Sequence, residues 1–145
     1  MKGPTIDILL VDDNPGDVLL TTEAFAGAQF SSRIHSVEDG QEALTFLNRE
    51  GRFQDAPVPD LILLDLNMPR MSGHEVLDVL KRNERFRRIP VVVLTSSNAE
   101  ADVLRSYDSH ANCYICKPTH YEHYFEVVRS VEGFWLNTVL LPPRQ

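Results

Sequence analysis

The sequence has few cysteines and no long apolar run. Two cysteines in 145 residues exclude a disulfide framework and fit a reducing compartment. The longest aliphatic runs, such as residues 61–64, fall far below the ~20 residues of a membrane-spanning helix. The start, Met1-Lys2-Gly3-Pro4, has no signal-peptide pattern. We therefore expect a cytoplasmic protein that makes no membrane contact.

Positive charge is also scarce. Fourteen lysines and arginines stand against 21 aspartates and glutamates, which leaves a formal net charge of −7. Nucleic-acid binding depends on neutralising phosphates, so direct binding to nucleic acid is disfavoured. A composition of 43% apolar and 24% charged residues is typical of a globular domain. We expect a single domain over residues 1–145, with a short C-terminal extension from about residue 136.

Three apolar runs each end in polar side chains, and two weaker runs resemble them. The strong runs are residues 8–11, before Asp12 and Asp13; residues 61–64, before Asp65; and residues 91–94, before Thr95. The weaker ones are residues 34–37 and 114–116. Short continuous apolar runs are typical of strands buried on both faces of a parallel sheet.

Helix start signals lie between these strands. Asn14-Pro15 is typical of an N-cap with proline at the first helical position. Capping-box patterns begin at Ser72, Ser97 and Thr119, and residues 41–49 form a weaker helix candidate. The alternation predicts an α/β fold: a doubly wound (βα)5 parallel sheet in strand order 2-1-3-4-5, with helices on both faces.

Polar groups at strand ends form the candidate site. In open parallel sheets, ligands bind beyond the carboxyl ends of the strands, where the strand order reverses. Asp12, Asp13 and Asp65 would share that crevice. Two carboxylates ~4 Å apart repel by about 4 kcal/mol at an effective dielectric of 20, so the cluster requires a cation. Carboxylates beside open water suit Mg²⁺.

The same cluster indicates phosphoryl chemistry. A carboxylate can attack phosphorus, and Asp65, at the end of the central strand, is the candidate nucleophile. Lys117 supplies an ammonium and Thr95 a hydroxyl for the phosphoryl oxygens. The backbone carbonyl of Asn67, two residues after the nucleophile, could complete the metal shell.

At these residues the chain resembles the receiver domain of two-component response regulators. The resemblance runs from about residue 6 to the end of the last helix. The matching segments are Asp12-Asp13, residues 64–69 with Ser72-Gly73, residues 94–97, and Tyr114-x-x-Lys117-Pro118. The family has a flavodoxin-like fold and acts as a signalling protein, not as an enzyme beyond its own phosphorylation and dephosphorylation.

The resemblance implies a role for each matching residue. Asp65 would take a phosphoryl group from the phosphohistidine of a histidine kinase. Asp13, Asp65 and the Asn67 carbonyl would bind Mg²⁺ directly, with Asp12 acting through water. Thr95 and Lys117 would bond the phosphoryl oxygens, Tyr114 would be the aromatic switch residue, and the Lys117–Pro118 peptide bond would be cis.

A narrower resemblance is to stand-alone regulators paired with bacterial phytochromes. It rests on residues 13–17, 48–59 and 134–136, and it implies a bacteriophytochrome kinase and output by protein contact. In that group the last helix and its extension are associated with homodimers. The candidate interface residues here are Tyr124, Val128, Val131, Phe134 and Trp135. The alternative is that this apolar end folds back onto the core.

Two other function classes share this architecture. An aspartate-nucleophile phosphatase would carry a second acid two residues after the nucleophile, where this chain has Asn67. A flavodoxin-like binding protein would carry phosphate-cradling loops where this chain has Asp12-Asp13. Multiple turnover or bound flavin would favour one of these over a phosphorylatable signalling protein.

Overall fold

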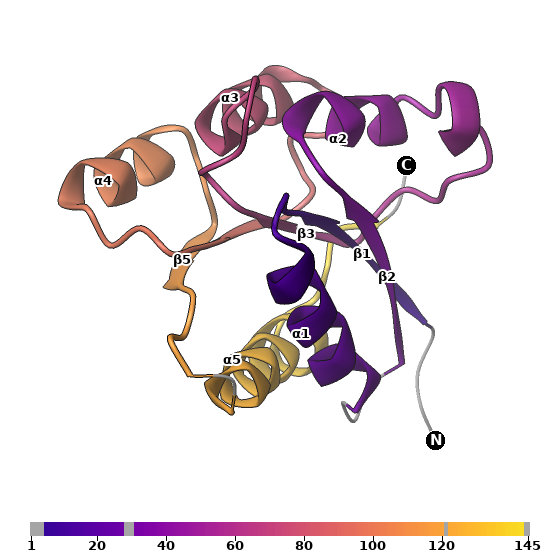
Figure 1. The fold of residues 1–145 in the computed structure, drawn as a ribbon. Coiled ribbons are helices and arrows are strands. Elements are labelled where there is room, and N and C mark those ends of the chain that lie inside the picture. The colour runs from indigo at the N-terminus through magenta and orange to yellow at the C-terminus, as the bar shows by residue number, and fades with distance from the viewer. Residues whose placement is uncertain (1–4, 28–30, 121, 144–145) are drawn as a thin grey trace.

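Strands and helices alternate along the chain in a computed structural model that describes residues 5–27, 31–120 and 122–143 (Figure 1). The strands are β1 (Ile6–Val11), β2 (Ser32–Val37), β3 (Leu61–Leu64), β4 (Val91–Thr95) and β5 (Cys113–Cys116). The helices are α1 (Pro15–Ala26), α2 (Gly40–Leu47), α3 (Gly73–Arg82), α4 (Glu100–Asp108) and α5 (His123–Val131). A 3-10 turn, η1 (Gly51–Phe53), precedes β3, and a π-helical turn, η2 (Glu132–Thr138), follows α5. Within the described ranges, every helix is too short or too polar to span a membrane.

The strands form one parallel sheet in the order β2-β1-β3-β4-β5. This confirms the expected doubly wound arrangement, because the chain crosses from β2 on one side of β1 to β3 on the other. The register aligns Val11 with Leu64 and Leu64 with Val93. The residues that follow these strands therefore meet at one edge of the sheet.

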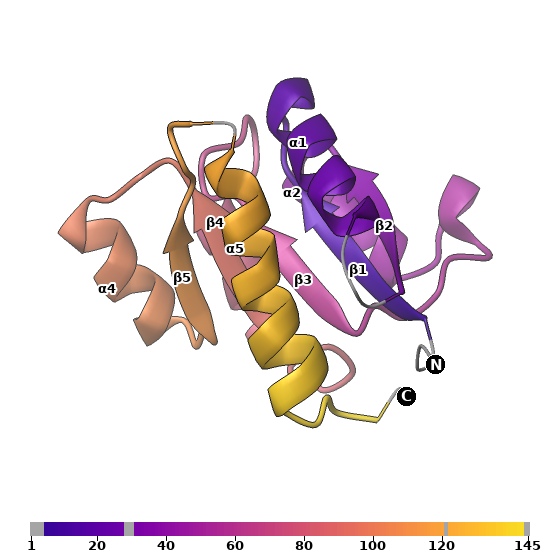
Figure 2. The ribbon, with the colours of Figure 1, turned by 90° about the horizontal axis from the view of Figure 1, so that it is seen from below.

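Helices cover both faces of the sheet. Helices α1 and α5 lie on one face, and α2 and α3 lie on the other, with α4 beside β5 (Figures 1 and 2). Side chains alternate between the two cores: Leu9 and Val11 pack toward α2 and α3, whereas Ile8 and Leu10 pack toward α1 and α5. This two-sided burial explains why the strands are continuously apolar.

Two of the expected helix starts are confirmed. The Asn14 side chain accepts a hydrogen bond from the backbone N–H of Asp17 at 3.1 Å, and α1 begins at Pro15. Ser72 Oγ accepts one from the Glu75 N–H at 3.3 Å, before α3 begins. These caps satisfy donors that the first helical turn leaves unpaired.

The other two capping-box predictions are wrong. Helix α4 begins at Glu100, after Ala99, and Ser97 Oγ accepts from the Ala99 N–H at 3.3 Å and donates to Asp102 Oδ2 at 2.5 Å. Helix α5 begins at His123 without a side-chain cap, so Thr119 does not start it.

The apolar stripe of α5 faces inward. Tyr124, Val128 and Val131 are only 3–4% exposed, and the two valines belong to the core under α1 and α5. The prediction that these three residues form an interface is therefore wrong, because they fill the space between α5 and the sheet. Trp135 is half-buried against the same core, and Phe134 is 51% exposed. An interface at Phe134 and Trp135 stays a prediction.

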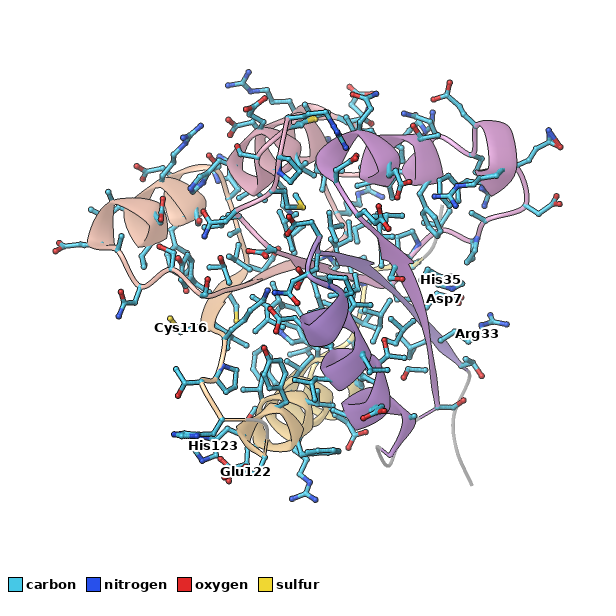
Figure 3. The ribbon with its side chains drawn as sticks, viewed as in Figure 1. Asp7, Arg33, His35, Cys116, Glu122 and His123 are labelled. Carbon is cyan, nitrogen blue, oxygen red and sulfur yellow. The ribbon has the colours of Figure 1, made fainter. Side chains whose placement is uncertain are left out.

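A second buried carboxylate lies at the opposite end of the sheet from the candidate site. Asp7, near the start of β1, is aligned with Arg33 on β2 (Figure 3). Arg33 Nε donates to Asp7 Oδ1 at 2.9 Å, and its Nη2 donates to Oδ2 at 3.2 Å. His35 Nε2 lies 2.9 Å from Asp7 Oδ1. This cluster joins β1 to the edge strand.

Candidate functional site

Strand β1 places two carboxylates at the carboxyl end of the sheet. Asp12 is 3% exposed, and its Oδ1 accepts a hydrogen bond from the Asn14 N–H at 2.9 Å. The next residue, Asp13, is exposed. Burial raises the pKa of Asp12, against the opposing effect of its hydrogen bonds to Lys117 and Asn14. A buried carboxylate under this influence favours a positive partner.

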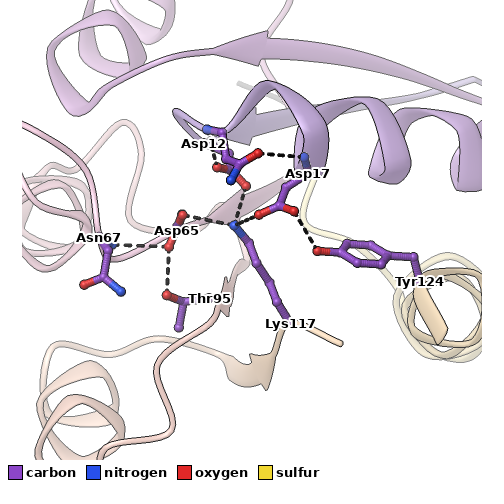
Figure 4. Close-up of polar contacts among 8 residues, drawn as sticks. Asp12, Asp17, Asp65, Asn67, Thr95, Lys117 and Tyr124 are labelled. Carbon is purple, nitrogen blue, oxygen red and sulfur yellow. Dashed lines mark hydrogen bonds and ion pairs between the residues drawn. The ribbon is translucent and has the colours of Figure 1, made fainter. Parts of the chain in front are cut away.

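Strand β3 places Asp65 beside them. The Asp65 N–H donates to the Val11 carbonyl at 2.9 Å, which fixes the carboxylate next to the end of β1. Asp65 Oδ1 accepts hydrogen bonds from Thr95 Oγ1 at 2.7 Å and from the Asn67 N–H at 3.2 Å (Figure 4). Thr95 is fully buried, so its hydroxyl is a fixed donor at the end of β4.

Gly73 lets α3 begin directly behind the loop that follows Asp65. Its N–H donates to the Leu66 carbonyl at 3.0 Å. A Cβ at this position would lie 2.2 Å from the Asp65 carbonyl oxygen and 2.7 Å from the Leu66 Cα, both backbone atoms. Any larger residue would push the loop away from α3, so glycine is required for this close approach. The loop that carries Asn67 is therefore held against a rigid helix.

The structure brings the three predicted metal-binding carboxylates together. Oxygen atoms of Asp12, Asp13 and Asp65 all lie within 4.8 Å of one another. Hard carboxylate ligands with one exposed member suit a hydrated divalent cation. The donor set therefore fits a divalent metal, which would offset the repulsion among these groups.

Lys117 supplies positive charge to the same pocket. Its ammonium lies 2.7 Å from Asp12 Oδ2 and 3.1 Å from Asp65 Oδ2, and its side chain is 6% exposed. The backbone N–H of Lys117 donates to the Thr95 carbonyl at 2.7 Å, which ties the end of β5 to β4. Burial opposes the charged form, but hydrogen bonds to the carboxylates outweigh it and raise the pKa of Lys117. The ammonium therefore stays protonated at neutral pH.

Sequence reasoning missed Asp17 and Tyr124 as parts of this pocket. Lys117 Nζ lies 2.8 Å from Asp17 Oδ2, and Tyr124 Oη donates to Asp17 Oδ1 at 3.0 Å (Figure 4). From the sequence, Tyr124 was predicted only as an interface residue, and Asp17 had no predicted role in the site. One signal was available: Asp17 lies in the first turn of α1, which begins shortly after the carboxyl end of β1.

Tyr114 bonds to the loop beyond Thr95. Its hydroxyl donates to the Ser97 carbonyl at 2.8 Å. The ring is half-buried and packs against the core under α2 and α3. Tyr114 therefore contacts the segment that joins β4 to α4, and Thr95, at the start of that segment, binds Asp65.

The expectation of a cis bond before Pro118 is wrong. The described chain contains no cis peptide bond, so the Lys117–Pro118 bond is trans. The trans form is the intrinsically favoured isomer of such bonds.

Comparison with known proteins agrees with this geometry. Residues 8–129 match the family model described as the response regulator receiver domain. The chain belongs to the response regulator receiver family. Response regulator Rcp1 from Synechocystis sp. is 44% identical to this receiver over 141 residues, which cover 97% of this chain and 96% of Rcp1.

Solved structures of receivers match nearly the whole chain. The phosphorylated cyanobacterial phytochrome response regulator RcpA is 44% identical and superposes with a TM-score of 0.92, covering 97% of this chain and 100% of RcpA. The Mn²⁺-bound form of Rcp1 is 43% identical with a TM-score of 0.89, covering 95% of this chain and 99% of that one. The protein is therefore a response regulator signalling protein of a family that works with histidine kinases. This decides against the phosphatase and flavodoxin-like alternatives.

Proposed function

We propose that Asp65 accepts a phosphoryl group from the phosphohistidine of a sensor histidine kinase, and that the receiver then signals by a changed surface and protein contact. The arrangement around Asp65 carries this proposal. Thr95 Oγ1 lies 2.7 Å from one carboxylate oxygen and Lys117 Nζ lies 3.1 Å from the other. Asp12 and Asp13 complete an acidic cluster beside them. Phosphoryl transfer needs such donors and acidic ligands in one place.

The proposed reaction uses Asp65 as the nucleophile. One carboxylate oxygen attacks phosphorus, and a P–O bond forms as the P–N bond to the donor histidine breaks. The electron pair of that bond leaves on the histidine nitrogen. The new group adds about −1.5 to −2 charges by analogy with other phosphorylated side chains. Thr95 and Lys117 stabilise it by donating to its oxygens, and the protein's chemistry is limited to its own phosphorylation and dephosphorylation.

The acidic cluster is the proposed site for one Mg²⁺. Asp13, Asp65 and the Asn67 backbone carbonyl would be direct ligands, with Asp12 acting through water. When bound, Mg²⁺ would supply positive charge shared between the carboxylates and the phosphoryl oxygens. The exposure of Asp13 supports entry of a hydrated ion from solvent. The likeness to the Mn²⁺-bound form of Rcp1 supports a divalent ion in this fold.

The proposed switch connects Thr95 to Tyr114. A phosphoryl group on Asp65 would hold Thr95, and the Tyr114 ring would occupy the space behind it. Support comes from the Thr95–Asp65 hydrogen bond and from the half-buried Tyr114, whose hydroxyl reaches the Ser97 carbonyl. The segment before α4 would carry the change to the surface, where a partner protein reads it.

The proposed kinase is a bacterial phytochrome, a bacteriophytochrome. The likeness to RcpA, described as a phytochrome response regulator, supports this pairing. We also expect a homodimer through the last helix and the extension from about residue 136, near the exposed side chains of Phe134 and Leu140. The net charge of −7 favours protein over nucleic acid as partner. The unpaired Cys113 and Cys116 suit the cytoplasm.

Phosphorylation with a small donor tests the proposal. The purified protein is incubated with Mg²⁺ and acetyl phosphate, and the intact mass is followed. We expect one alkali-labile phosphoryl group per chain, and we expect Asp65→Asn to abolish it. Asp55→Asn, an exposed carboxylate outside the pocket, is the matched control and should be phosphorylated like the wild type. Unchanged labelling of Asp65→Asn would contradict the assignment.

A further inference from the structure

All three donors of the Lys117 ammonium are taken by carboxylates. An ammonium group has three N–H donors, and here Asp12, Asp17 and Asp65 each accept at 2.7, 2.8 and 3.1 Å. A phosphoryl oxygen can bond to Lys117 only when one carboxylate gives up its place. Phosphorylation converts Asp65 into an acyl phosphate, so the bond from Lys117 to Asp65 is the one redirected onto the phosphoryl group. The other two carboxylates then decide where the ammonium stays.

Asp17 differs from Asp12 in its other contacts. Asp12 belongs to the carboxylate cluster that fits a metal, whereas Asp17 lies outside that cluster. A cation in the cluster would compete with Lys117 for the oxygens of Asp12. Asp17 is therefore the partner that can keep Lys117 in place whatever the metal does.

The fold fixes the Asp17 carboxylate from its own helix. Asp17 lies in the first turn of α1, where Pro15 starts the helix and the Asn14 side chain binds the Asp17 N–H at 3.1 Å. The positive end of the helix dipole favours a negative side chain at this place. The carboxylate thus points into the pocket from an ordered turn.

Tyr124 fixes the second oxygen of Asp17 from α5. Its hydroxyl donates to Asp17 Oδ1 at 3.0 Å, and Tyr124 is only 4% exposed. Asp17 Oδ2 is then left facing Lys117. With both oxygens engaged, the carboxylate cannot rotate without losing one hydrogen bond.

We propose that Asp17 and Tyr124 form a positioning pair that holds the Lys117 ammonium where it meets the phosphoryl group. The inference rests on the proposed phosphorylation of Asp65 and deepens it. The pair acts through Lys117 and touches neither the phosphoryl group nor the metal. It also joins the pocket to α5, a connection independent of Thr95 and Tyr114.

The rate of phosphorylation by acetyl phosphate at saturating Mg²⁺ tests the pair. We expect Asp17→Ala to lower the maximal rate constant about tenfold and Tyr124→Phe about threefold, because small misplacement of a catalytic group is costly. Asp17→Asn should restore the rate to within about twofold, since an amide can accept from Lys117 and donate to the Tyr124 hydroxyl. A merely structural role would not show this rescue.

Two further measurements isolate positioning from other causes. Mg²⁺ affinity, measured by calorimetric titration, should be unchanged in Asp17→Ala. Glu23→Ala, an exposed acid on the same helix, should leave the rate unchanged. Circular dichroism confirms that each variant is folded.

Several outcomes would overturn the inference. A rate in Asp17→Ala equal to or above the wild-type rate would show that Asp17 is a bystander or a competitor. Equal loss in Asp17→Asn and Asp17→Ala would show that charge, rather than position, matters. Failure of the pair leaves normal wild-type phosphorylation on Asp65, whereas failure of the proposed function would leave the wild type unlabelled and would remove the inference with it.

Discussion

Buried aspartates lie near both ends of strand β1, and the charges around the two carboxylates differ. Asp7 is fully buried but bound by Arg33 through both oxygens, with His35 2.9 Å away (Figure 3). The cation bound to it, Arg33, comes from the neighbouring strand β2. Asp7 therefore holds β1 to β2, and its charge is offset by groups of the chain itself.

At the other end of β1 the anions outnumber the cations. Asp12 and Asp65 share the ammonium of Lys117 with Asp17, and Asp13 adds a further carboxylate. These groups come from three strands and a helix, so no local pairing neutralises them. The excess negative charge is available to a bound metal. Burial of a carboxylate does not by itself indicate function; an uncompensated cluster does.

The largest expected difference between the two ends of β1 is in their effect on the affinity for Mg²⁺. We expect Asp13→Ala to weaken Mg²⁺ binding by at least about 100-fold, because even changes outside the ligand shell cost about 10–100-fold. Asp7→Asn should leave the affinity unchanged, since Asp7 lies at the far end of β1. Calorimetric titration checks both variants. Equal affinity of Asp13→Ala and wild type would place the metal elsewhere.

The free energy of unfolding should depend more on Asp7 than on Asp12, which is the reverse of the order for metal affinity. We expect Asp7→Asn to lower the free energy of unfolding by about 2 kcal/mol, because hydrogen bonds to a charged group contribute about 1.5–3 kcal/mol and exposure of Arg33 weakens them. Asp12→Asn should leave it unchanged or raise it without metal, since burial disfavours the Asp12 charge. Urea unfolding in a chelator measures both. A larger loss of unfolding free energy in Asp12→Asn than in Asp7→Asn would contradict this prediction.

The fold was predictable because its signals are local. The apolar runs before Asp12, Asp65 and Thr95 define the three central strands, and parallel pairing forces their ends together. The predicted helix starts at Ser97 and Thr119 failed, because neither residue is the cap of the helix that follows. Ser97 Oγ instead binds Asp102 and the Ala99 N–H.

In the candidate site, only the residues that directly follow strands were predictable from the sequence. Asp12, Asp65 and Lys117 follow strands, so topology alone brings them together. Asp17 and Tyr124 lie on helices, and their meeting depends on how α1 packs against α5. A stripe of apolar spacing does not reveal that one of its members ends in a hydroxyl bound to a carboxylate.

A smaller effect is expected at Tyr124, which contacts Asp17 at the end of β1 where carboxylates are in excess. Burial, followed by the nearby charge of Asp17, raises the pKa of Tyr124 to about 12. Folding thus favours the neutral phenol, and its contribution is fully present below the unfolded pKa of about 10 and lost as the pH rises through about 12. We expect Tyr124→Phe to lower the free energy of unfolding by about 1 kcal/mol at neutral pH, with the difference closing above pH about 10. In a pH titration followed by tyrosinate absorbance, this variant should lack the component that ionises at the highest pH.

Asp39 should show the smallest effect on stability, because the cation that binds its carboxylate is exposed to solvent. Its Oδ1 caps α2 through the Glu42 N–H, and its Oδ2 binds Arg70, whose side chain is 75% exposed. The backbone hydrogen bond from Glu42, followed by that from Arg70, lowers the pKa of Asp39. Its stabilisation is therefore present above the unfolded pKa of about 3.9 and is lost as the pH falls through the folded pKa. Asp39→Asn keeps a good cap, so we expect a loss of only about 0.5 kcal/mol at neutral pH after screening, vanishing in acid. Urea unfolding at both pH values measures it, and a loss as large as that of Asp7→Asn would show that partner exposure does not set the contribution of these ion pairs.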